Sequence, residues 1–464
     1  MNYRAPRGTH DIFGEDAAKM SWLEQKARDI FKKHGFEEVR TPIFEESSLF
    51  IRSVGQPTDI VEKEMYTFED KKGRKLALRP EGTTSLVRAF IEHKMDVLMP
   101  VSKFFYAGEM FRYERPQSGR YRQFHQIGAE FFCVSSPVAD AEIILLACDL
   151  LDFVGINEME ARFDNGHFFE MKVHLNSLGC RKCRHVLREK LVEYLISLSN
   201  LCENCLRRLV KNPLRILDCK TDSYKFTEIP QLSSYLCDEC KHDFDLLKSL
   251  LEVAKCDYVV DNKLVRGLDY YTKTVFEICC SDILSSINSS TPIKDAVNCY
   301  DQNFKPYYIK ARRMNKDLNR RITLAAGGRY DNLVKDLSGQ DTPAVGFALG
   351  SERVLIVAEK FGSPEFYKSF RKFEKVYVAI ADQELFKEAF SFAVKIARNG
   401  LKNSKDISVF GPINDKSLTW QLKFADKIGA RKTIIFVKTE FKKGKVLVKN
   451  MENKVQTEAS ICEL

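Results

Sequence analysis

The chain has 464 residues, of which 44% are hydrophobic and 30% are charged, as is usual for a globular protein. This length predicts two or three domains, each able to bury its own core. No run approaches the roughly 18 apolar residues that a membrane span needs, and residues 1–7 contain no apolar signal core. We therefore expect a cytoplasmic protein without a membrane partner.

The sequence also lacks several common nucleotide-binding and metal-binding motifs. It contains no phosphate-binding loop of the form Gly-x4-Gly-Lys-Ser/Thr, no dinucleotide-binding glycine fingerprint and no His-Glu-x-x-His motif. A nucleotide would therefore bind through another architecture. The formal net charge of +9 suits a polyanionic partner, although it is too small to identify one.

The amino-terminal part predicts a helix that leads into an edge strand. Residues 7–11 form a turn-rich basic opening, and residues 17–33 place apolar side chains at helical spacing before Gly35. Residues 36–44 alternate as a strand does, and Pro42 confines that strand to an edge or a bend. A long helix followed by such a strand is a common dimer interface, and an ordinary edge strand is an equally good interpretation.

Two short strands, at 66–70 and 75–80, are expected to precede a helix at 85–94. Residues 81–84, Glu-Gly-Thr-Thr, supply a good start signal for that helix. The Glu81 carboxylate would lie where the strand becomes the helix. There it either places a favourable charge at the helix start or grips an amine.

Residues 111–132 are the most informative stretch, because they combine a basic hairpin with a single enclosed carboxylate. They predict an antiparallel pair of strands with a long tip around Gly119. Arginine matches phosphate oxygens bidentately, where lysine offers only a point charge. Aromatic residues anchor both arms and surround Glu130, so we favour a partly buried site for a polyanion over a solvated basic hairpin. The arginines of the hairpin are Arg112, Arg115, Arg120 and Arg122.

After an amphipathic helix expected at 137–154, the composition shifts to Lys, Arg, Leu and Cys, and we interpret residues 171–262 as an inserted domain. In a chain without an export signal, its cysteines are expected to be reduced thiols or metal ligands. The Cys-x2-Cys spacing is typical of structural zinc sites. The candidate metal ligands of this segment are Cys180, Cys183, Cys202, Cys205, Cys219, Cys237 and Cys240.

One zinc ion cannot bind the first two of these pairs if the helix between them forms. A helix over residues 184–199 would separate its ends by roughly 24 Å, at about 1.5 Å per residue. The second pair with Cys219 would avoid this conflict, and so would the second pair with the third. The zinc candidates are therefore Cys202, Cys205, Cys237 and Cys240. The sequence alone does not assign one group of four cysteines as the ligands of an ion.

Residues 263–278 predict a turn followed by a strand. Arg266 precedes Gly267, which lets a backbone or a ligand approach closely. The apolar neighbours of Arg266 favour burial against an anion over an ordinary surface turn. Tyr270 and Tyr271 offer flat walls and hydroxyl groups.

The remaining chain begins with one long insertion and continues with predicted strands and helices. Residues 279–321 are rich in Lys and Arg and predict a flexible loop, with an additional RNA contact as the alternative. Residues 325–334 predict a strand, a glycine turn and a helix. Residues 344–356 predict a strand of small residues, against which a flat ligand can lie, running into a helix that carries Arg353. Residues 376–437 follow a βαβαβ pattern, which predicts a small α/β domain with a mostly parallel sheet.

These stretches resemble the histidyl-tRNA synthetases, a family of class II aminoacyl-tRNA synthetases, over nearly the whole chain. Residues 264–271, Leu-Val-Arg-Gly-Leu-Asp-Tyr-Tyr, and 326–331, Ala-Gly-Gly-Arg-Tyr-Asp, are similar to the two signatures peculiar to this family. The opening Arg-Gly-Thr-His-Asp at 7–11 is also similar. The stretches that resemble motifs 1, 2 and 3 are residues 17–44, 111–132 and 344–356.

The resemblance implies an α+β fold, with a class II catalytic core on a central antiparallel sheet. It also implies an inserted, mainly helical domain near the tRNA acceptor arm, a carboxy-terminal α/β domain that binds the anticodon, and a homodimer joined through motif 1. Residues 279–321 are much longer than the family's usual link between the two signatures. The expected divisions are core residues 1–170, inserted domain 171–262, core residues 263–365 and anticodon-binding domain 374–464.

Roles follow from the same resemblance. Arg112 would hold the α-phosphate of ATP, and Arg353 would hold its γ end, with magnesium on the phosphates. Arg266 would neutralise the charge that grows as the histidine carboxylate attacks the α-phosphate. The other expected histidine-binding residues are Glu81, Gly82, Thr83 and Gln126, toward the α-amino group, and Glu130, Tyr270 and Tyr271, toward the imidazole. The expected tRNA contacts are Arg115, Gln117 and Arg120.

The implied activity is the ATP-dependent ligation of L-histidine to tRNA(His), through histidyl-adenylate and release of pyrophosphate. One alternative is a catalytically silent, synthetase-like regulator; such relatives tend to lose the signature arginine and the anticodon domain, whereas this chain has Arg266 and the βαβαβ tail. A second alternative is a nucleic-acid-binding adaptor that uses only the basic insertions. It would show no histidine-dependent exchange of pyrophosphate into ATP.

Overall fold

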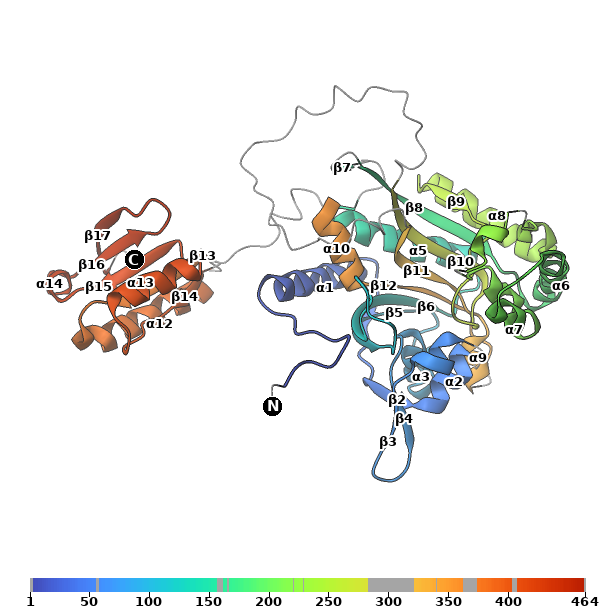
Figure 1. Cartoon of the computed structure of the whole chain (residues 1–464), viewed down its shortest axis with the longest axis horizontal. Helices are drawn as coiled ribbons and strands as arrows, with labels where there is room; N and C mark the ends of the chain where they lie inside the picture. Colours follow the sequence, from blue (N-terminus) through green and yellow to red (C-terminus); the bar gives the residue numbers. More distant parts are fainter. Residues whose placement is uncertain are drawn as a thin grey trace, which may run out of the picture. The chain divides into compact units, whose positions relative to one another are not determined.

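The computed structural model describes residues 3–55, 58–156, 162–164, 167–219, 221–227, 229–282, 321–338, 340–361, 374–402 and 407–462. The chain divides into two compact units, Met1–Tyr367 and Lys368–Leu464 (Figure 1). Among the helices of these described ranges, none is both long and apolar enough to cross a membrane. Most of the expected basic loop, residues 283–320, lies outside the described residues.

A nine-stranded sheet organises the described part of the first unit, in the order β1-β5-β6-β12-β11-β10-β8-β7, with β9 paired to β8. The pairs β1–β5 and β8–β9 are parallel and the other neighbours are antiparallel. The antiparallel centre expected from the sequence is therefore confirmed. The strands are β1 (Glu37–Glu38), β5 (Ser102–Phe111), β6 (Gln123–Phe132), β7 (Arg162–Asp164), β8 (His167–Ser177), β9 (Tyr258–Val260), β10 (Thr272–Asp282), β11 (Ile322–Arg329) and β12 (Ala344–Gly350).

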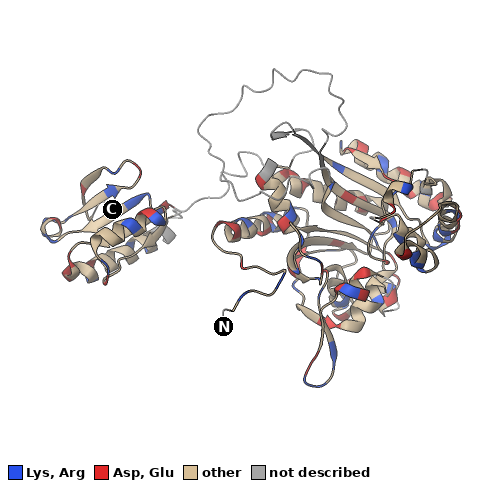
Figure 2. Cartoon of the chain, viewed as in Figure 1, with Lys and Arg blue, Asp and Glu red and all other residues tan. Residues whose placement is uncertain are grey.

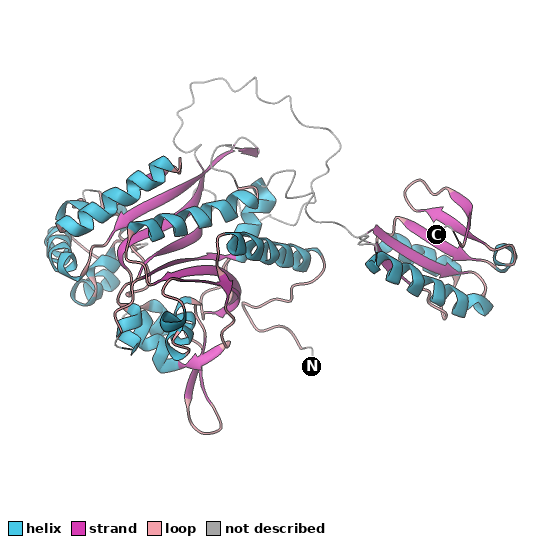
Figure 3. Ribbon diagram, turned by 180° about the vertical axis from the view of Figure 1, so that it is seen from behind, coloured by secondary structure: helices cyan, strands magenta, loops and turns pink. Residues whose placement is uncertain are grey.

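Three helices pack together against the sheet, and α5 lies across its middle strands (Figure 3). Because α5 is enclosed between the sheet and other helices, it is apolar nearly all round, with Ile143, Leu146 and Leu150 fully buried. The other two helices contact strand β6 beside it. These helices are α1 (Glu15–Lys33), α5 (Pro137–Phe153) and α10 (Ser351–Phe361).

The first unit also contains a small three-stranded sheet and several short helices, most of which come from the residues before strand β5. The strand expected at 36–44 is in fact two strands in different sheets, β1 at the edge of the large sheet and β2 in the small one. The chain bends at Pro42, where the guanidinium of Arg79 donates to the carbonyl of Thr41 at 3.0 Å. These elements are β2 (Phe44–Glu46), α2 (Ser47–Val54), the π-helix η1 (Ile60–Glu64), β3 (Thr67–Glu69), β4 (Lys75–Leu78), α3 (Thr83–Glu92), α4 (Met95–Leu98) and α9 (Leu333–Ser338).

The cysteine-rich segment is mainly helical, as expected, and Figure 2 shows basic and acidic residues interspersed over its helices. Residues 171–177, which composition assigned to the insertion, lie in strand β8 of the large sheet. On α6, Cys183, Leu187, Leu191 and Leu195 recur every four residues and form its buried face. The elements are α6 (Arg181–Ser197), α7 (Glu203–Lys211), α8 (Asp238–Val253) and the 3-10 turns η2 (Pro213–Ile216), η3 (Ser223–Lys225) and η4 (Leu232–Tyr235).

The second unit has the expected βαβαβ series, and its first three strands are parallel. Two antiparallel strands that the sequence did not predict extend this sheet, in the order β14-β13-β15-β16-β17. Their signal was weak because β17 is short and largely exposed. The elements are β13 (Glu374–Ile380), the 3-10 turn η5 (Gln383–Leu385), α12 (Phe386–Lys402), β14 (Ile407–Phe410), α13 (Leu418–Lys427), β15 (Lys432–Phe436), α14 (Lys438–Phe441), β16 (Lys445–Asn450) and β17 (Gln456–Ser460).

Two further expectations about the sheet are wrong. The glycine turn expected within 325–334 does not form, because β11 continues through Gly327, where a Cβ atom would come within 2.2 Å of the Gly346 carbonyl oxygen. Glycine there allows close approach of two strands rather than a turn. The expected start of the loop, at residue 279, is also wrong. Strand β10 continues to Asp282, and Cys279 is buried in it.

A buried ion pair joins the sheet to α5. Arg329, at the end of β11, is 1% exposed, and its Nε donates to both carboxylate oxygens of Asp140 at 3.0 and 3.2 Å. Its other nitrogens donate to the carbonyls of Val134 and Ser136. The signature arginine at this position therefore ties α5 to the sheet.

We expect Asp140→Asn to destabilise the larger unit by up to about 3–5 kcal/mol, because it removes the fully buried counter-charge of Arg329 and leaves it only the carboxylate of Asp331 at 3.1 Å. Chemical denaturation followed by tryptophan and tyrosine fluorescence measures this loss. Asp341→Asn is the matched control, since Asp341 pairs with Lys335 on the surface with 72% of its side chain exposed and should change stability by less than about 0.5 kcal/mol. Equal effects of the two variants would contradict the structural role of the Arg329–Asp140 pair.

Candidate active site

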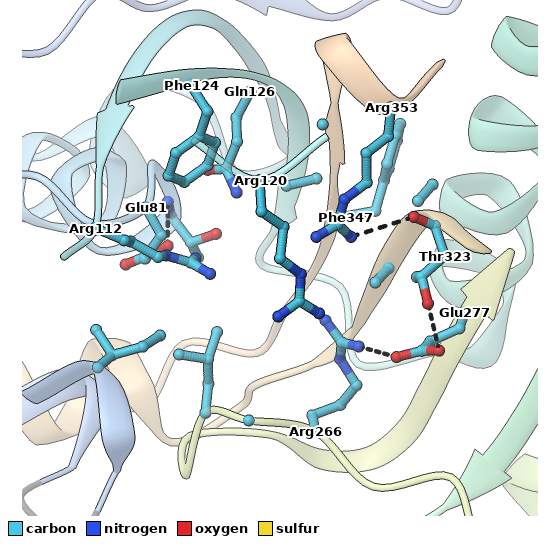
Figure 4. A pocket seen from close by; sticks show the side chains of 18 of the residues that line it. Glu81, Arg112, Arg120, Phe124, Gln126, Arg266, Glu277, Thr323, Phe347 and Arg353 are labelled. Atoms are coloured by element: carbon cyan, nitrogen blue, oxygen red, sulfur yellow. Dashed lines mark hydrogen bonds and ion pairs between the residues drawn. The ribbon is translucent and has the colours of Figure 1, made fainter. Parts of the chain in front are cut away.

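A cavity of about 430 Å³ opens on the large sheet. Its floor is formed by the small residues of β11 and β12, and its walls by the β5–β6 hairpin, the loop before β10 and the start of α10 (Figure 4). Of the residues expected to bind substrates, those that line it are Glu81, Thr83, Arg112, Arg120, Gln126, Glu130, Arg266, Tyr270, Tyr271 and Arg353.

Arginines from three distant parts of the chain meet in this cavity. The Nε atom of Arg112 donates to the carbonyl of Pro80 at 2.8 Å, and its guanidinium lies 5.3 Å from the centre of the Phe124 ring. Arg353 donates from Nε to the carbonyl of Gly119 at 3.1 Å. Burial and the nearby charge of Arg120 lower the pKa of Arg353. Arg112 and Arg353 donate to backbone carbonyls, and the nearest carboxylate to Arg112, that of Glu114, lies 3.9 Å away, so both guanidiniums keep charge that an anion can bind.

Arg266 is held in place by a carboxylate that the sequence analysis missed. Its guanidinium pairs with Glu277 on β10, and Glu277 also accepts a hydrogen bond from Thr323 Oγ1 at 3.1 Å (Figure 4). The Nε atom of Arg266 is buried and has no hydrogen-bond partner among the described residues, and the same is true of Gln126 Oε1. Buried polar atoms are usually paired, and because Arg266 and Gln126 both line the cavity, a ligand bound there is the partner available to these two atoms.

Glu81 lies where β4 leads into α3, as the sequence indicated. Its two carboxylate oxygens accept from the backbone N–H groups of Thr83 and Thr84 at 2.7 and 2.9 Å. These contacts place its charge at the positive end of the helix. They also leave lone pairs directed at the cavity that Glu81 lines.

Glu130 is completely buried beside the cavity. Its oxygens accept from the hydroxyls of Thr83 and Tyr330, both at 2.6 Å. Burial raises the pKa of Glu130 to about 8, despite these two hydrogen bonds. Gly346 on the neighbouring strand makes room for it, because a Cβ there would come within 1.6 Å of Glu130 Oε2.

Not every expected residue lines the cavity. Gly82 precedes α3, and a Cβ there would overlap the Tyr106 ring, so its role in the structure is close packing. Arg115 and Gln117 are exposed at the hairpin tip, outside the cavity. The sequence analysis missed Tyr330, although it lies in the second signature, and also missed Arg215 and Asp218 from the inserted segment. Arg215 and Asp218 lie far along the chain from the recognised motifs, so no sequence pattern connected them with the site.

The cysteines form two clusters, and one of them unites the second pair with Cys219, which is one of the two groupings that the sequence left open. Within the described residues, the ligand atoms of each cluster lie within 4.8 Å of one another. The set Cys202, Cys205, Cys237 and Cys240 is wrong as one site, because the starts of α6 and α8 lie side by side and unite the first pair with the third. The four-cysteine cluster is Cys180, Cys183, Cys237 and Cys240, and the cysteine–aspartate cluster is Cys202, Cys205, Cys219 and Asp222.

The raised pKa of Glu130 has a consequence for stability. Between its ordinary value of 4.5 and about 8, the folded chain holds a proton on Glu130 that the unfolded chain has lost, so the free energy of unfolding falls as pH rises through this range. Each pKa unit corresponds to about 1.4 kcal/mol. Glu130→Gln, which cannot ionise, should therefore gain stability relative to the unmodified chain between pH 5 and pH 8, by a few kcal/mol in order of magnitude. Denaturation curves at several pH values measure this gain, and parallel pH profiles would contradict it.

Comparisons with known proteins agree with this geometry. The family model described as Histidyl-tRNA synthetase matches residues 8–289. A relative named "Histidine--tRNA ligase" from Endomicrobium trichonymphae is 64% identical over 463 residues, covering 100% of both chains. Another of the same name from Aquifex aeolicus is 42% identical over 467 residues, again covering 100% of both chains.

A solved structure shows the same fold. The apo histidyl-tRNA synthetase of S. aureus aligns with a TM-score of 0.72 at 29% identity, covering 99% of this chain and 98% of that one. The family match spans more than half of the chain, and the relatives are similar over its full length. The chain therefore belongs to the histidyl-tRNA synthetase family, the ATP-dependent histidine–tRNA ligases of class II.

Proposed function

We propose that the cavity binds L-histidine and ATP, forms histidyl-adenylate with release of pyrophosphate, and then passes histidine to the 3′ end of tRNA(His). The observation that carries this proposal is the meeting of Arg112, Arg266 and Arg353 in one cavity beside the buried Glu130. Histidine-dependent exchange of labelled pyrophosphate into ATP tests it. Failure of exchange in the purified, folded chain would refute the proposed activity.

Two guanidiniums are suited to the phosphates of ATP. We assign the α-phosphate to Arg112, whose contact with the Pro80 carbonyl fixes its direction. Arg353, at the start of α10, is assigned to the γ end. Phe124, against which Arg112 lies, offers a flat wall in the same cavity. ATP enters as its magnesium complex, so the ion is part of the substrate.

Histidine is assigned to the space between α3 and Glu130. The carboxylate of Glu81 and the unpartnered Gln126 Oε1 accept from the α-amino group, and Thr83 lies beside them. Beyond the hydrogen bonds from Thr83 and Tyr330, Glu130 offers a lone pair on each oxygen when it is ionised and a proton to donate when it is protonated. Glu130 and the hydroxyl of Tyr270 then pair the two imidazole nitrogens, with Tyr271 in the same wall. A side chain without these nitrogens leaves both groups unsatisfied and is rejected.

Arg266 is assigned to the developing charge. As a carboxylate oxygen of histidine attacks the α-phosphorus, the bond to the bridging oxygen of pyrophosphate breaks and negative charge grows on the phosphoryl oxygens. A guanidinium already fixed by Glu277 stabilises this charge without rearrangement. No nucleophilic side chain is required, because most of the barrier is the positioning of two anions.

Arg266→Ala should lower kcat for pyrophosphate exchange by about 100-fold or more, as loss of one preorganised donor does, with little change in histidine or ATP binding. Glu277 keeps its contacts with Arg321 and Thr323, so the fold should survive the change. Arg74→Ala is the control, because Arg74 pairs with Asp70 on the surface and 67% of its side chain is exposed. Unchanged exchange in Arg266→Ala would refute the assigned role.

The hairpin tip is assigned to the tRNA. Arg115 and Gln117 are exposed there, while Arg120 reaches into the cavity and lies 3.4 Å from Glu114. This arrangement would let one end of the tip contact the tRNA backbone and the other contact its terminal nucleotides.

Arg115→Ala should slow transfer to tRNA about tenfold, the value of one charge-assisted hydrogen bond, and should leave pyrophosphate exchange unchanged. Single-turnover transfer from preformed histidyl-adenylate separates the two steps. Equal loss in both steps would show that the hairpin tip shapes the cavity instead.

We further propose a cytoplasmic homodimer joined through the motif 1 region, where Ile43 and Phe44 are exposed beside Phe68. The four-part division at 170, 262, 365 and 374 also remains a proposal, with the inserted domain on the acceptor arm and residues 374–464 on the anticodon. Structural zinc in the inserted segment is a separate proposal that does not depend on the activity.

A further inference from the structure

We propose that the inserted segment binds two zinc ions, one at the four-cysteine cluster and one at the cysteine–aspartate cluster, and that the second ion holds Arg215 against the loop that carries Arg266. The metal sites stand independently of the proposed function. The effect on the loop rests on that function, because it is measured through pyrophosphate exchange.

The spacing of the sulfur atoms fits a tetrahedral ion. In the four-cysteine cluster, Cys180 Sγ lies 3.8 Å from Cys183 Sγ and 4.0 Å from Cys237 Sγ. In the cysteine–aspartate cluster, Cys202 Sγ lies 3.7 Å from Cys219 Sγ. Zinc–sulfur bonds of about 2.3 Å at tetrahedral angles separate two sulfurs by about 3.8 Å. A disulfide would need about 2.05 Å, so these sulfurs are arranged as ligands rather than bonded pairs.

The backbone around both clusters favours thiolates. Each Cys-x2-Cys pair begins a helix, since Cys180, Cys202 and Cys237 are the N-cap residues of α6, α7 and α8. A helix start carries a partial positive charge that stabilises a thiolate, the form that binds metal. Within the four-cysteine cluster, the backbone N–H of Cys237 also donates to Cys183 Sγ at 3.0 Å.

The carboxylate of the cysteine–aspartate cluster is held in place by its own partners. Asp222 is 2% exposed, and its Oδ2 accepts from the backbone N–H of Cys202 at 2.8 Å while its Oδ1 pairs with Lys225 at 3.0 Å. These contacts hold the carboxylate toward the three sulfurs, as partners behind a metal ligand do. Structural zinc sites are built mainly from cysteine and histidine, and an aspartate oxygen is also a zinc ligand that can complete a tetrahedral set.

The cysteine–aspartate cluster closes a loop that reaches the active site. The chain leaves the cluster at Cys202, runs through α7 and η2, and returns at Cys219. Between these points the Arg215 guanidinium donates to the carbonyl of Gly267 at 2.5 Å, directly after Arg266 in the sequence. Asn212 donates to Asp269 at 2.7 Å in the same loop.

The position of Arg215 depends on this closure. Its guanidinium also lies 3.5 Å from Asp59, as part of a network in which Arg208 contacts Asp59 at 2.9 Å. Arg208 and Arg215 both come from the closed loop, and both contact the catalytic core. An ion that joins the two ends of the loop would therefore fix Arg215, a positioning residue, against the signature loop.

Metal analysis of the purified full chain tests the sites directly. After exposure to zinc and removal of excess, we expect two zinc ions per chain. Cys180→Ser with Cys183→Ser should leave one, and so should Cys202→Ser with Cys205→Ser. Cys462→Ser, at an exposed cysteine outside both clusters, should retain two. Asp222→Cys should also retain two, because a thiolate replaces the carboxylate, whereas Asp222→Ala should retain one.

The coupling to the active site has its own readout. The Cys202→Ser, Cys205→Ser variant and Arg215→Ala should show the same fall in kcat for exchange, about tenfold, with little change in the KM for ATP. Arg215→Ala should keep both zinc ions, and Arg215→Lys should recover part of the activity. A folded chain with fewer than two zinc ions, or thiols oxidised in pairs, would overturn the metal sites. Full exchange in Arg215→Ala would overturn the coupling, whereas absence of exchange in the unmodified chain would overturn the proposed function alone.

Discussion

The enclosure of several guanidiniums in one cavity is the constraint on which the rest of the structure depends. Arginine keeps its charge when buried, so each group must have a fixed contact that offsets its lost hydration. Arg112 has the Pro80 carbonyl, Arg353 has the Gly119 carbonyl, and Arg266 has Glu277. These contacts direct the guanidiniums into a cavity whose walls also carry carboxylates, among them Glu114 at 3.9 Å from Arg112. In the proposed function, the phosphates of ATP and the carboxylate of histidine bind the guanidinium nitrogens that these contacts leave free.

The sheet supplies the floor against which this charge is arranged. Gly327 and Gly346 let β11 and β12 approach closely, and Gly346 also leaves the space that Glu130 occupies. Glu130 then joins strand β6 to Tyr330 beyond β11 and to Thr83 at the start of α3. The hydrogen bonds that hold the proposed imidazole-reading group thus cross three separate segments of the chain. On the opposite side, α5 and the Arg329–Asp140 pair keep these strands in place.

Local patterns were sufficient to predict much of this structure. Helical spacing gave α1 and α5, the start signal at residues 81–84 gave α3, and the small residues before Arg353 gave β12 running into α10. The hairpin of residues 111–132 followed from its turn residues and aromatic arms. Patterns failed where tertiary contacts decide the outcome. Gly327 suggested a turn because its partner strand is not visible in the sequence, and β17 is too exposed to alternate clearly.

The candidate site likewise contains residues that the sequence predicted and residues that it did not predict. Residues within recognisable motifs, such as Arg112 and Arg266, were predicted and line the cavity. Glu277 and Arg215 were missed, because each acts through a partner that only folding brings near. The cysteine pairs show the limit most clearly. Helix length excluded one grouping, but the choice among the others depended on which helix starts meet in space.

A crystal structure of the full chain with a non-hydrolysable histidyl-adenylate analogue tests the central claim most directly. Our account predicts that Arg112 and Arg266 both donate to the group that replaces the phosphate, and that an imidazole nitrogen lies within hydrogen-bond distance of Glu130. An analogue bound outside the cavity, or bound inside it with its imidazole directed away from Glu130, would contradict the account.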